Sequence, residues 1–473
     1  MNWTLALPEI VLACIGMATL IFGVLRKHDS TLLCTMFTIG GFVIAGFLVF
    51  TGDYGFGFHG QFVADPFSSF NQLLILSGAA LSTILALDWN RTQGIARFEF
   101  PVLMLFSTVG MMIMASASNL MTLYLGLELQ SLALYVLAAF ARDDLRSSEA
   151  GLKYFVLSGL ASGLLLYGIS LVYGFSGTMD LASLHELLVQ PTSASAGLVV
   201  GIVFVLVGLA FKVSAVPFHM WTPDVYEGAP APVTVFFATA PKVAAMALLL
   251  RVMGTSFASM VGAWQLLVII ISIGSMLLGA VAAIGQTNIK RLMAYSSIGH
   301  MGYALIGLAV GTSNGVRGVL VYMVIYVFMT AGTFGCILAM QRKGKAVEQI
   351  SDLSGLAAND PLLAMVLTVF MFSLAGIPPM SGFFAKLYIF LAAVQGGLWT
   401  LAVVGVLTSV IGAFYYIRII KVMYFDAPAE RFDARPASLS FVVAATGLFT
   451  GFFFLFPAPF VAAAQAAAGV LFR

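Results

Sequence analysis

The sequence predicts an all-α membrane protein with about fourteen transmembrane helices, and two observations support this prediction. Hydrophobic residues make up 61% of the chain and charged residues only 9%, whereas an ordinary soluble domain carries about 25% charged residues. Apolar runs of about 20 residues, the length that crosses a ~30 Å hydrocarbon core, follow one another from Leu7 to Phe456. The composition therefore excludes a water-soluble fold and leaves no stretch for a separate soluble domain.

Polar clusters divide the apolar sequence into separate predicted helices. They span residues 7–25, 31–50, 68–88, 98–117, 119–140, 149–174, 195–226, 231–252, 259–284, 288–311, 315–341, 361–395, 397–424 and 437–456. All are predicted to be helical because lipid offers no partners to open backbone groups, and a closed barrel would show short alternating segments instead. No Lys or Arg precedes the first range, unlike a cleavable signal peptide, so we expect it to be retained.

The distribution of basic residues predicts the orientation. Those that follow odd-numbered helices are Arg26, Lys27, Arg91, Arg97, Arg142, Arg146, Lys290, Arg291, Arg342, Lys343, Lys345, Lys421, Arg431 and Arg435. Those at the opposite ends are only Arg251, Arg317 and Arg473. Because short cytoplasmic loops carry the excess of Lys and Arg, we expect a multi-pass protein of the bacterial inner membrane with both termini on the periplasmic side.

Two long predicted helices contain proline near mid-span: Pro217 in FKVSAVPFHMW, and Pro378 with Pro379 in AGIPPMSGFFAK. Interior proline removes a helical hydrogen bond and clashes with the preceding turn, so each helix is predicted to break there. Each broken helix is the fourth in a group of five, which predicts two inverted five-helix repeats. The predicted parts are three N-terminal helices in 1–97, a first repeat in 98–258, a second inverted repeat in 259–430, and a C-terminal helix with a short tail in 431–473.

Ionisable residues deep in the predicted helices indicate transport. Glu128, Lys212 and Lys242 together oppose membrane insertion by roughly 8–10 kcal/mol if they are unpaired, so folding alone would favour leucine at these positions. A buried lysine near a carboxylate can gain and lose a proton as that partner moves, which predicts a proton relay. We expect Glu128 to be the acidic partner and Lys153, on the adjoining helix, to contact it. The alternative is a set of static ion pairs that fix helix packing.

Three further residues join the predicted relay. His219 follows the Pro217 break and His300 lies mid-span in MAYSSIGHMGY. Imidazole titrates near neutral pH and can pass a proton through its two nitrogens, although either histidine can equally be a hydrogen-bonded packing residue. Lys386 lies inside an apolar span beside the second break. Lys153 lies only about one turn from the cytoplasmic end, so its side chain can also extend to the interface.

Motifs for other chemistry are missing from the sequence. It has no GxGxxG between a strand and a helix, no GxxxxGK[ST] and no iron–sulfur cysteine run, and its cysteines are isolated. His185 and Glu186 begin an HExxH-like string, but Val189 stands where the second histidine would be. The net charge of +2 and the lack of a basic stretch do not indicate a surface that binds nucleic acid. We therefore expect this chain to bind no cofactor, metal or nucleic acid.

Three long strings carry a family resemblance: FKVSAVPFHMWTPDVYEGAPAPVT, IGQTNIKRLMAYSSIGHMGY and AGIPPMSGFFAK. With Glu128 in its setting, they resemble the antiporter-like subunits of respiratory complex I over nearly the whole chain. The opening PEIVLACIGMATLI, Lys386 and the end soon after the fourteenth helix resemble the subunit N branch of that family.

The resemblance implies residue roles. Glu128 would couple to a neighbouring subunit, with Lys153 as its modulating partner. Lys212 would be the lysine at the first helix break, and Lys242 would be a connecting site. Lys386 would be the lysine of the second break, which exchanges protons with the outer side.

The resemblance also implies partners. They would be a neighbouring antiporter-like subunit, small membrane subunits and a peripheral arm. NADH, FMN, iron–sulfur clusters and quinone would be bound by those other subunits, and this chain would supply a proton path. Two alternatives stay open, namely a subunit of a multi-subunit sodium/proton antiporter and a scaffold that conducts nothing.

Overall fold

The computed structural model describes residues 2–189 and 195–472, so Met1, Arg473 and residues 190–194 lie outside the described part. Eleven described helices are long and apolar enough to cross a membrane, which agrees with the predicted fold class. The helices that form the membrane bundle and its edges are α1 (Leu7–Leu25), α2 (Thr31–Thr51), α3 (Pro66–Thr92), α4 (Glu99–Ser116), α5 (Leu120–Ala138), α6 (Leu145–Ser176), α7 (Leu181–Leu188), α8 (Ala196–Lys212), α9 (Trp221–Gly228), α10 (Ala231–Ala238), α11 (Ala240–Arg251), α12 (Val261–Ile284), α13 (Ile289–Val310), α14 (Ser313–Leu338), α15 (Leu356–Asn359), α16 (Pro361–Ala375), α17 (Ser381–Gln395), α18 (Trp399–Phe425), α19 (Ala437–Phe452) and α20 (Ala458–Val470).

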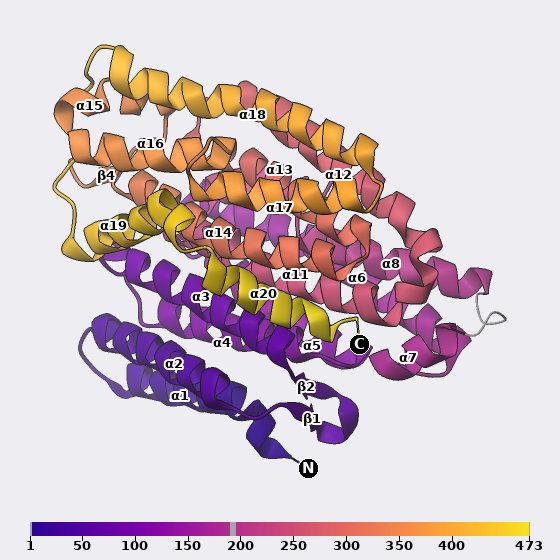
Figure 1. The fold of residues 1–473 in the computed structure, drawn as a ribbon. Helices are drawn as coiled ribbons and strands as arrows, with labels where there is room; N and C mark the ends of the chain where they lie inside the picture. The colour runs from indigo at the N-terminus through magenta and orange to yellow at the C-terminus, as the bar shows by residue number, and fades with distance from the viewer. Residues whose placement is uncertain (1, 190–194, 473) are drawn as a thin grey trace.

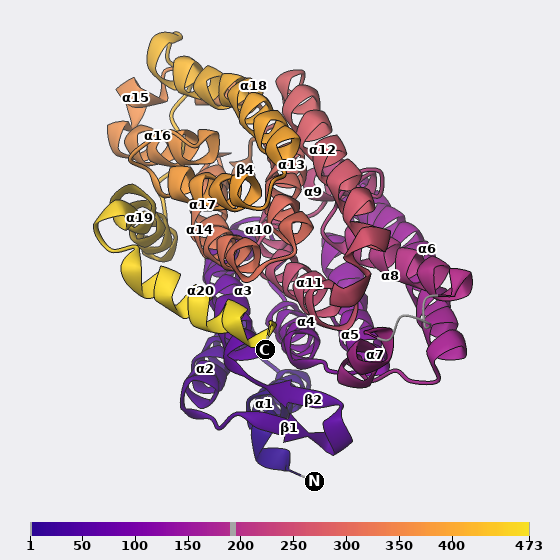
Figure 2. The same cartoon turned by 45° about the vertical axis from the view of Figure 1, so that its right-hand side comes forward.

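The long helices run roughly side by side, and short elements cover the two ends of the bundle (Figure 1). The β1–β2 hairpin (Gly55–Gly57 with Phe62–Ala64), α7 and both chain ends lie toward one end. The β3–β4 hairpin (Gln341–Arg342 with Lys345–Ala346) and α15 lie at the other. Figure 2 shows α1 and α2 as a pair at one edge, with α12 and α18 at the opposite edge.

Both predicted helix breaks are present. The chain leaves the first long helix after α8 ends at Lys212, and it resumes as α9 at Trp221. It leaves the second after α16 ends at Ala375, and it resumes as α17 at Ser381. Ser214 in the first break has a left-handed φ of 62°, a conformation that non-glycine residues adopt mainly where surrounding packing fixes them.

A third break was not predicted. The range 231–252 was expected to be one helix, but it consists of α10 and α11, which meet at Thr239. Pro241 accounts for the difference, because it has no N–H to continue the hydrogen-bond ladder. The Thr239 hydroxyl donates to the Val235 carbonyl at 2.8 Å, so it satisfies one carbonyl at the end of α10. Lys242 therefore lies in the first turn of a new helix.

Glycines allow α4 and α5 to pack closely. A Cβ at Gly110 would lie 2.5 Å from the Gln130 backbone nitrogen, and a Cβ at Gly126 would lie 3.0 Å from the Gly110 carbonyl oxygen. Small residues at such contacts let helix backbones approach each other inside the membrane. This contact positions the helix that carries Glu128.

A buried ion pair joins the N-terminal helices to α11. Arg251 donates to both carboxylate oxygens of Asp65 at 2.9 Å and to the Ala115 carbonyl at 3.2 Å. The sequence places Arg251 at the end of an apolar run, and its side chain is only 6% exposed. Burial raises the pKa of Asp65, but the Arg251 charge and hydrogen bonds from Arg251 and Ser68 outweigh it and hold the pKa below its usual value.

Candidate functional site: a buried row of ionisable side chains

We call five ionisable side chains of the bundle the buried row: Glu128, Lys212, Lys242, His300 and Lys386. Glu128 lies on α5 at the edge of this row. It is half-buried, and one of its carboxylate oxygens accepts a hydrogen bond of 2.5 Å from the Ser162 hydroxyl on α6. Ser162 also lies 3.1 Å from the Tyr124 hydroxyl. Because part of Glu128 stays accessible on the outer side of this chain, its carboxylate can respond to a charge outside the bundle.

Lys212 is the last residue of α8 and is 5% exposed. Its Nζ donates to the hydroxyls of Ser131 and Ser158, both at 2.7 Å. Tyr135 also donates to the Ser158 hydroxyl at 2.6 Å. Hydroxyls accept and donate, so this cage can hold the ammonium or pass on its proton. No described carboxylate forms an ion pair with Lys212.

Lys242 is 1% exposed and reaches back to the first helix break. Its Nζ donates to the Val213 carbonyl at 3.0 Å and to the Ser214 hydroxyl at 2.5 Å. Thr222, after the break, donates to the same Ser214 hydroxyl at 2.6 Å. The Trp221 ring lies 5.4 Å from Nζ, a cation–π contact. The break therefore supplies the partners of this buried lysine.

Lys386 repeats that arrangement at the second break. It is 7% exposed, and its Nζ donates to the carbonyls of Leu374 and Ala375, at 3.1 and 2.9 Å. These are the last carbonyls of α16, which have no partners within the helix. Nζ also donates to the Ser409 hydroxyl at 2.7 Å and lies 5.0 Å from the Tyr303 ring centroid.

His300 lies between tyrosines on the Lys386 side of the molecule. Its Nδ1 is hydrogen-bonded to the Tyr322 hydroxyl at 2.5 Å and its Nε2 to the Tyr416 hydroxyl at 3.3 Å. A cavity of about 10 Å³ is lined by both His300 and Lys386. That volume is about enough for one water molecule, so a single water can join the two groups.

His219 lies after the first break but outside the packed row. It is half-buried, and its Nδ1 has no hydrogen-bond partner among the described residues. None of the described hydrogen bonds joins it to Lys212 or Lys242, whose bonds go to serines and a carbonyl. The structure therefore does not bring His219 into contact with either lysine, and its part in the relay stays a prediction.

The predicted contact of Lys153 with Glu128 is also wrong for this conformation. Lys153 forms ion pairs with Glu149 and Asp224, both at 2.7 Å, and its side chain is 41% exposed. Asp224 also accepts a hydrogen bond from Arg291 at 2.8 Å. Near the helix end, the lysine gains two carboxylates and water, whereas Glu128 lies deeper in apolar surroundings.

Sequence reasoning missed two buried charged groups. Glu9 in α1 is 4% exposed, and its carboxylate accepts from the Gln72 side chain at 2.5 Å. The signal was an acid inside the apolar string LPEIV. Lys290 was counted only as a basic residue at a cytoplasmic helix end, but it is 2% exposed at the start of α13.

No group of three or more His, Cys, Asp or Glu side chains within residues 2–189 and 195–472 is arranged to hold a metal ion. The row consists instead of lysines, hydroxyls, imidazole and one carboxylate. These groups bind, store and transfer protons.

Known proteins resemble the chain at the level of family, sequence and fold. The model of the family described as NADH:quinone oxidoreductase/Mrp antiporter, transmembrane region, matches residues 117–412. The NADH-quinone oxidoreductase subunit N of Granulibacter bethesdensis is 64% identical over 100% of both chains. That of Parvibaculum lavamentivorans is 57% identical over 98% of this chain and 97% of its own length.

Two solved structures resemble the fold. A chain of respiratory complex I from Thermus thermophilus has a TM-score of 0.83 at 31% identity and covers 97% of this chain and 99% of its own. A chain of the Mrp complex from Dietzia sp. has a TM-score of 0.87 at 23% identity and covers 100% of this chain and 98% of its own, a likeness in fold alone. The row from Glu128 to Lys386 lies within the span that the family model matches. Because subunit N relatives also match along the whole chain, the chain belongs to the subunit N branch of the NADH:quinone oxidoreductase/Mrp antiporter family.

Proposed function

We propose that this chain is a proton-translocating membrane subunit of NADH-quinone oxidoreductase and that its buried row conducts the protons. One observation carries the proposal: Lys212, Lys242 and Lys386 are buried in the membrane bundle, and the groups that contact them among the described residues are hydroxyls, carbonyls and aromatic rings rather than carboxylates. A buried ammonium without a counter-charge is costly in the membrane, so such groups usually serve ion or proton pathways.

The order of the groups supports a path in two halves. Glu128 and Lys212 lie in the first half, with Lys242 at the first break, and His300 and Lys386 lie in the second half. The static-packing alternative needs ion pairs, which the three central lysines lack among the described residues. Lys153 takes a different part in the proposal, because it is held by Glu149 and Asp224 and would reach Glu128 only by exchanging partners. His219 would join only after a movement of the break.

Redox chemistry belongs elsewhere in this proposal. The chain works as the translocating part of an oxidoreductase complex, and NADH, FMN, iron–sulfur clusters and quinone are held by other subunits. Solved complex I chains supply the fold-level support for partners within such an assembly. Exposed Leu125 and Leu132 lie on α5 beside half-buried Glu128, which suits a neighbouring membrane subunit on this side.

The proposed organisation keeps two inverted repeats, 98–258 and 259–430, with the termini on the periplasmic side. Two isolated backbone bridges support it. Asn119, which caps α5, pairs with Asp180, and Asn288, which caps α13, pairs with Gln349. Each bridge joins the second helix of a predicted repeat to the segment after its third helix.

The substitution Lys212→Ala tests the proposal in the assembled complex. NADH-driven proton uptake into inverted membrane vesicles is expected to fall at least tenfold, because a positioned proton-transfer group typically contributes about 10²–10⁴-fold to a rate. Native gels check assembly. Lys343→Ala is the control, because that side chain is 84% exposed and should leave uptake unchanged. Unchanged uptake in assembled Lys212→Ala complex would refute the relay and favour the scaffold alternative.

The antiporter alternative predicts a different association. The chain would then purify without NADH-oxidising activity, and sodium gradients would drive proton movement in vesicles that contain it. Copurification with NADH-oxidising activity and sodium-independent uptake are the results expected here.

A further inference from the structure

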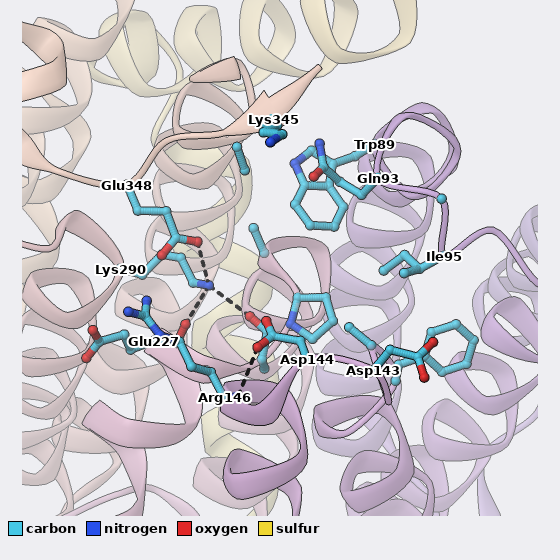
Figure 3. A pocket seen from close by; sticks show the side chains of 18 of the residues that line it. Trp89, Gln93, Ile95, Asp143, Asp144, Arg146, Glu227, Lys290, Lys345 and Glu348 are labelled. Atoms are coloured by element: carbon cyan, nitrogen blue, oxygen red, sulfur yellow. Dashed lines mark hydrogen bonds and ion pairs between the residues drawn. The ribbon is translucent and has the colours of Figure 1, made fainter. Parts of the chain in front are cut away.

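A cavity of about 710 Å³ opens at the end of the bundle that the basic residues assign to the cytoplasm (Figure 3). Its wall comes from the α3–α4, α5–α6 and α9–α10 connections, the start of α13, and β4 with the segment after it. The wall therefore includes both predicted repeats. The cavity lies apart from the row described above, because its lining contains none of the predicted relay residues.

A buried lysine lies at one side of this cavity. Lys290 is 2% exposed, and its Nζ donates to the Glu227 and Ala229 carbonyls, both at 2.8 Å. It also donates to the Glu348 carboxylate at 2.9 Å. These partners use all three N–H groups of the ammonium, so it is held in one place as a cation.

Glu348 is the group of this pair that solvent can reach. Its side chain is 24% exposed, and its second oxygen lies 3.2 Å from the Asn288 amide nitrogen. Figure 3 shows its carboxylate directed at Lys290, with Lys345 farther along the wall. A carboxylate that cavity water reaches can accept a proton from that water and later release it to another acceptor, while the fixed cation holds the carboxylate in place.

The wall itself does not resemble an anion site. It carries Arg97, Arg142, Arg146 and Lys345, but also Asp143 and Asp144. Asp144 accepts from its own helix backbone at Arg146. Charges of both signs around an open cavity favour neither an anion nor a metal cation strongly, which suits a water-filled vestibule.

An unpartnered hydroxyl lies beyond the cavity. Tyr226 precedes Glu227, whose carbonyl binds Lys290, and it is 0% exposed. Its hydroxyl has no hydrogen-bond partner among the described residues, although it lies close to Ser297 and Tyr326. Buried hydroxyls normally have a partner, so this one is suited to a transient water or proton.

Ser297 continues the line toward the second half of the row. It accepts a hydrogen bond of 2.8 Å from Tyr326. His300 follows three residues later on the same helix, so both side chains share a face of α13. Lys386 and His300 then line the same small cavity.

We propose that the 710 Å³ cavity is a cytoplasmic water vestibule through which this chain takes up protons, with Glu348 as the first acceptor and Lys290 as the residue that positions it. The inference rests on the proposed function. A proton from cavity water binds a Glu348 oxygen and leaves toward the Tyr226 hydroxyl. Tyr226, Ser297 and Tyr326 each accept one proton and release one, so no charge accumulates before His300.

The first experiment compares Glu348→Gln with Glu348→Asp in assembled complex. NADH-driven proton uptake is expected to fall at least tenfold in Glu348→Gln, because a positioned proton acceptor typically contributes about 10²–10⁴-fold, and to recover largely in Glu348→Asp. Asp352→Asn is the matched control, because Asp352 forms a 2.8 Å ion pair with Arg342, is 19% exposed and lies outside the vestibule. Equal losses in Glu348→Gln and Asp352→Asn would overturn the proposal in favour of a structural role.

The second variant, Tyr226→Phe, covers the case in which Glu348→Gln does not assemble. It removes a hydroxyl that bonds no described residue, so a purely structural role predicts no loss. We expect slower uptake and a larger rate difference between H₂O and D₂O. Wild-type uptake in Tyr226→Phe overturns this path.

The Lys212→Ala result separates the two proposals. If Lys212→Ala stops uptake while Glu348→Gln and Tyr226→Phe do not, only the vestibule is wrong. If Lys212→Ala has no effect, the proposed function itself fails.

Discussion

At the scale of single residues, the central lysines are held by groups that stay neutral. Lys212 has two serine hydroxyls, and Lys242 has a carbonyl and a serine. A hydroxyl or carbonyl stabilises the ammonium without fixing it as firmly as a carboxylate does. The proton can therefore leave at a smaller energetic cost. Such a site, however, contributes little to the stability of the fold.

Replacing Lys242 with methionine separates stability from function. Lys242→Met keeps a long apolar stem and removes a buried charge, so thermal stability in detergent is expected to hold or rise. Proton uptake is expected to fall at least about tenfold. Fluorescence-detected unfolding and vesicle assays measure the two effects. A large loss of stability with normal uptake would show that Lys242 is a packing residue.

At the scale of elements, the halves of each broken helix must stay close together. A Cβ at Gly382 on α17 would lie 1.8 Å from the Ser373 carbonyl oxygen on α16. The Gly382 backbone N–H also donates to the Ser373 hydroxyl at 2.9 Å. The contact holds Lys386 against the end of α16.

Gly382→Ala should therefore force the two halves apart. We expect lower thermal stability and a loss of proton uptake, because Lys386 would move from the carbonyls that bind it. Gly163→Ala is the control, since a Cβ there meets nothing within 4 Å. Similar behaviour of the two variants in unfolding and uptake assays would rule out this role of Gly382.

The Asp65–Arg251 pair links elements from distant parts of the sequence. Asp65→Asn leaves Arg251 buried without its counter-charge, which is expected to cost about 3–5 kcal/mol. The folded pKa of Asp65 lies below the unfolded value of about 3.9, so its stabilisation is present above that value and is lost as pH falls through the lowered pKa. The unfolding temperatures of wild type and Asp65→Asn, measured from pH 7 down to acid pH, should converge at the acid end.

The sequence predicted the breaks of α8–α9 and α16–α17 because proline stands in mid-helix, but the same signal at Pro241 was overlooked. It also predicted the buried lysines, since charges in apolar runs are conspicuous. It did not predict their partners. Ser131 and Ser158 reach Lys212 from two other helices, and such contacts depend on helix rotation that periodicity alone does not specify. For Lys153 the choice between Glu128 and Asp224 depended on depth, which is a tertiary property.

At the scale of the whole molecule, the two ends of the bundle carry different elements. α7 and α15 lie at opposite ends in Figure 1. The positive-inside pattern predicts that α15 lies on the cytoplasmic side and α7 on the periplasmic side.

Single cysteines can test that orientation. Ala182 on α7 and Ala358 on α15 are exposed, so Ala182→Cys and Ala358→Cys are a matched pair in a Cys14→Ser background. In inverted vesicles, a membrane-impermeant maleimide is expected to label Ala358→Cys directly and Ala182→Cys only after permeabilisation. The reverse pattern would invert the topology.

The carbonyls at the end of α16 and after α8 have one more consequence. A helix C-terminus carries roughly half a negative charge that comes from aligned peptide dipoles. Unlike a carboxylate, this charge cannot be neutralised by acid and cannot be removed by replacing a side chain. It attracts the ammonium groups of Lys242 and Lys386 at every pH. The electrostatic field at each lysine is therefore set by the backbone geometry of a break.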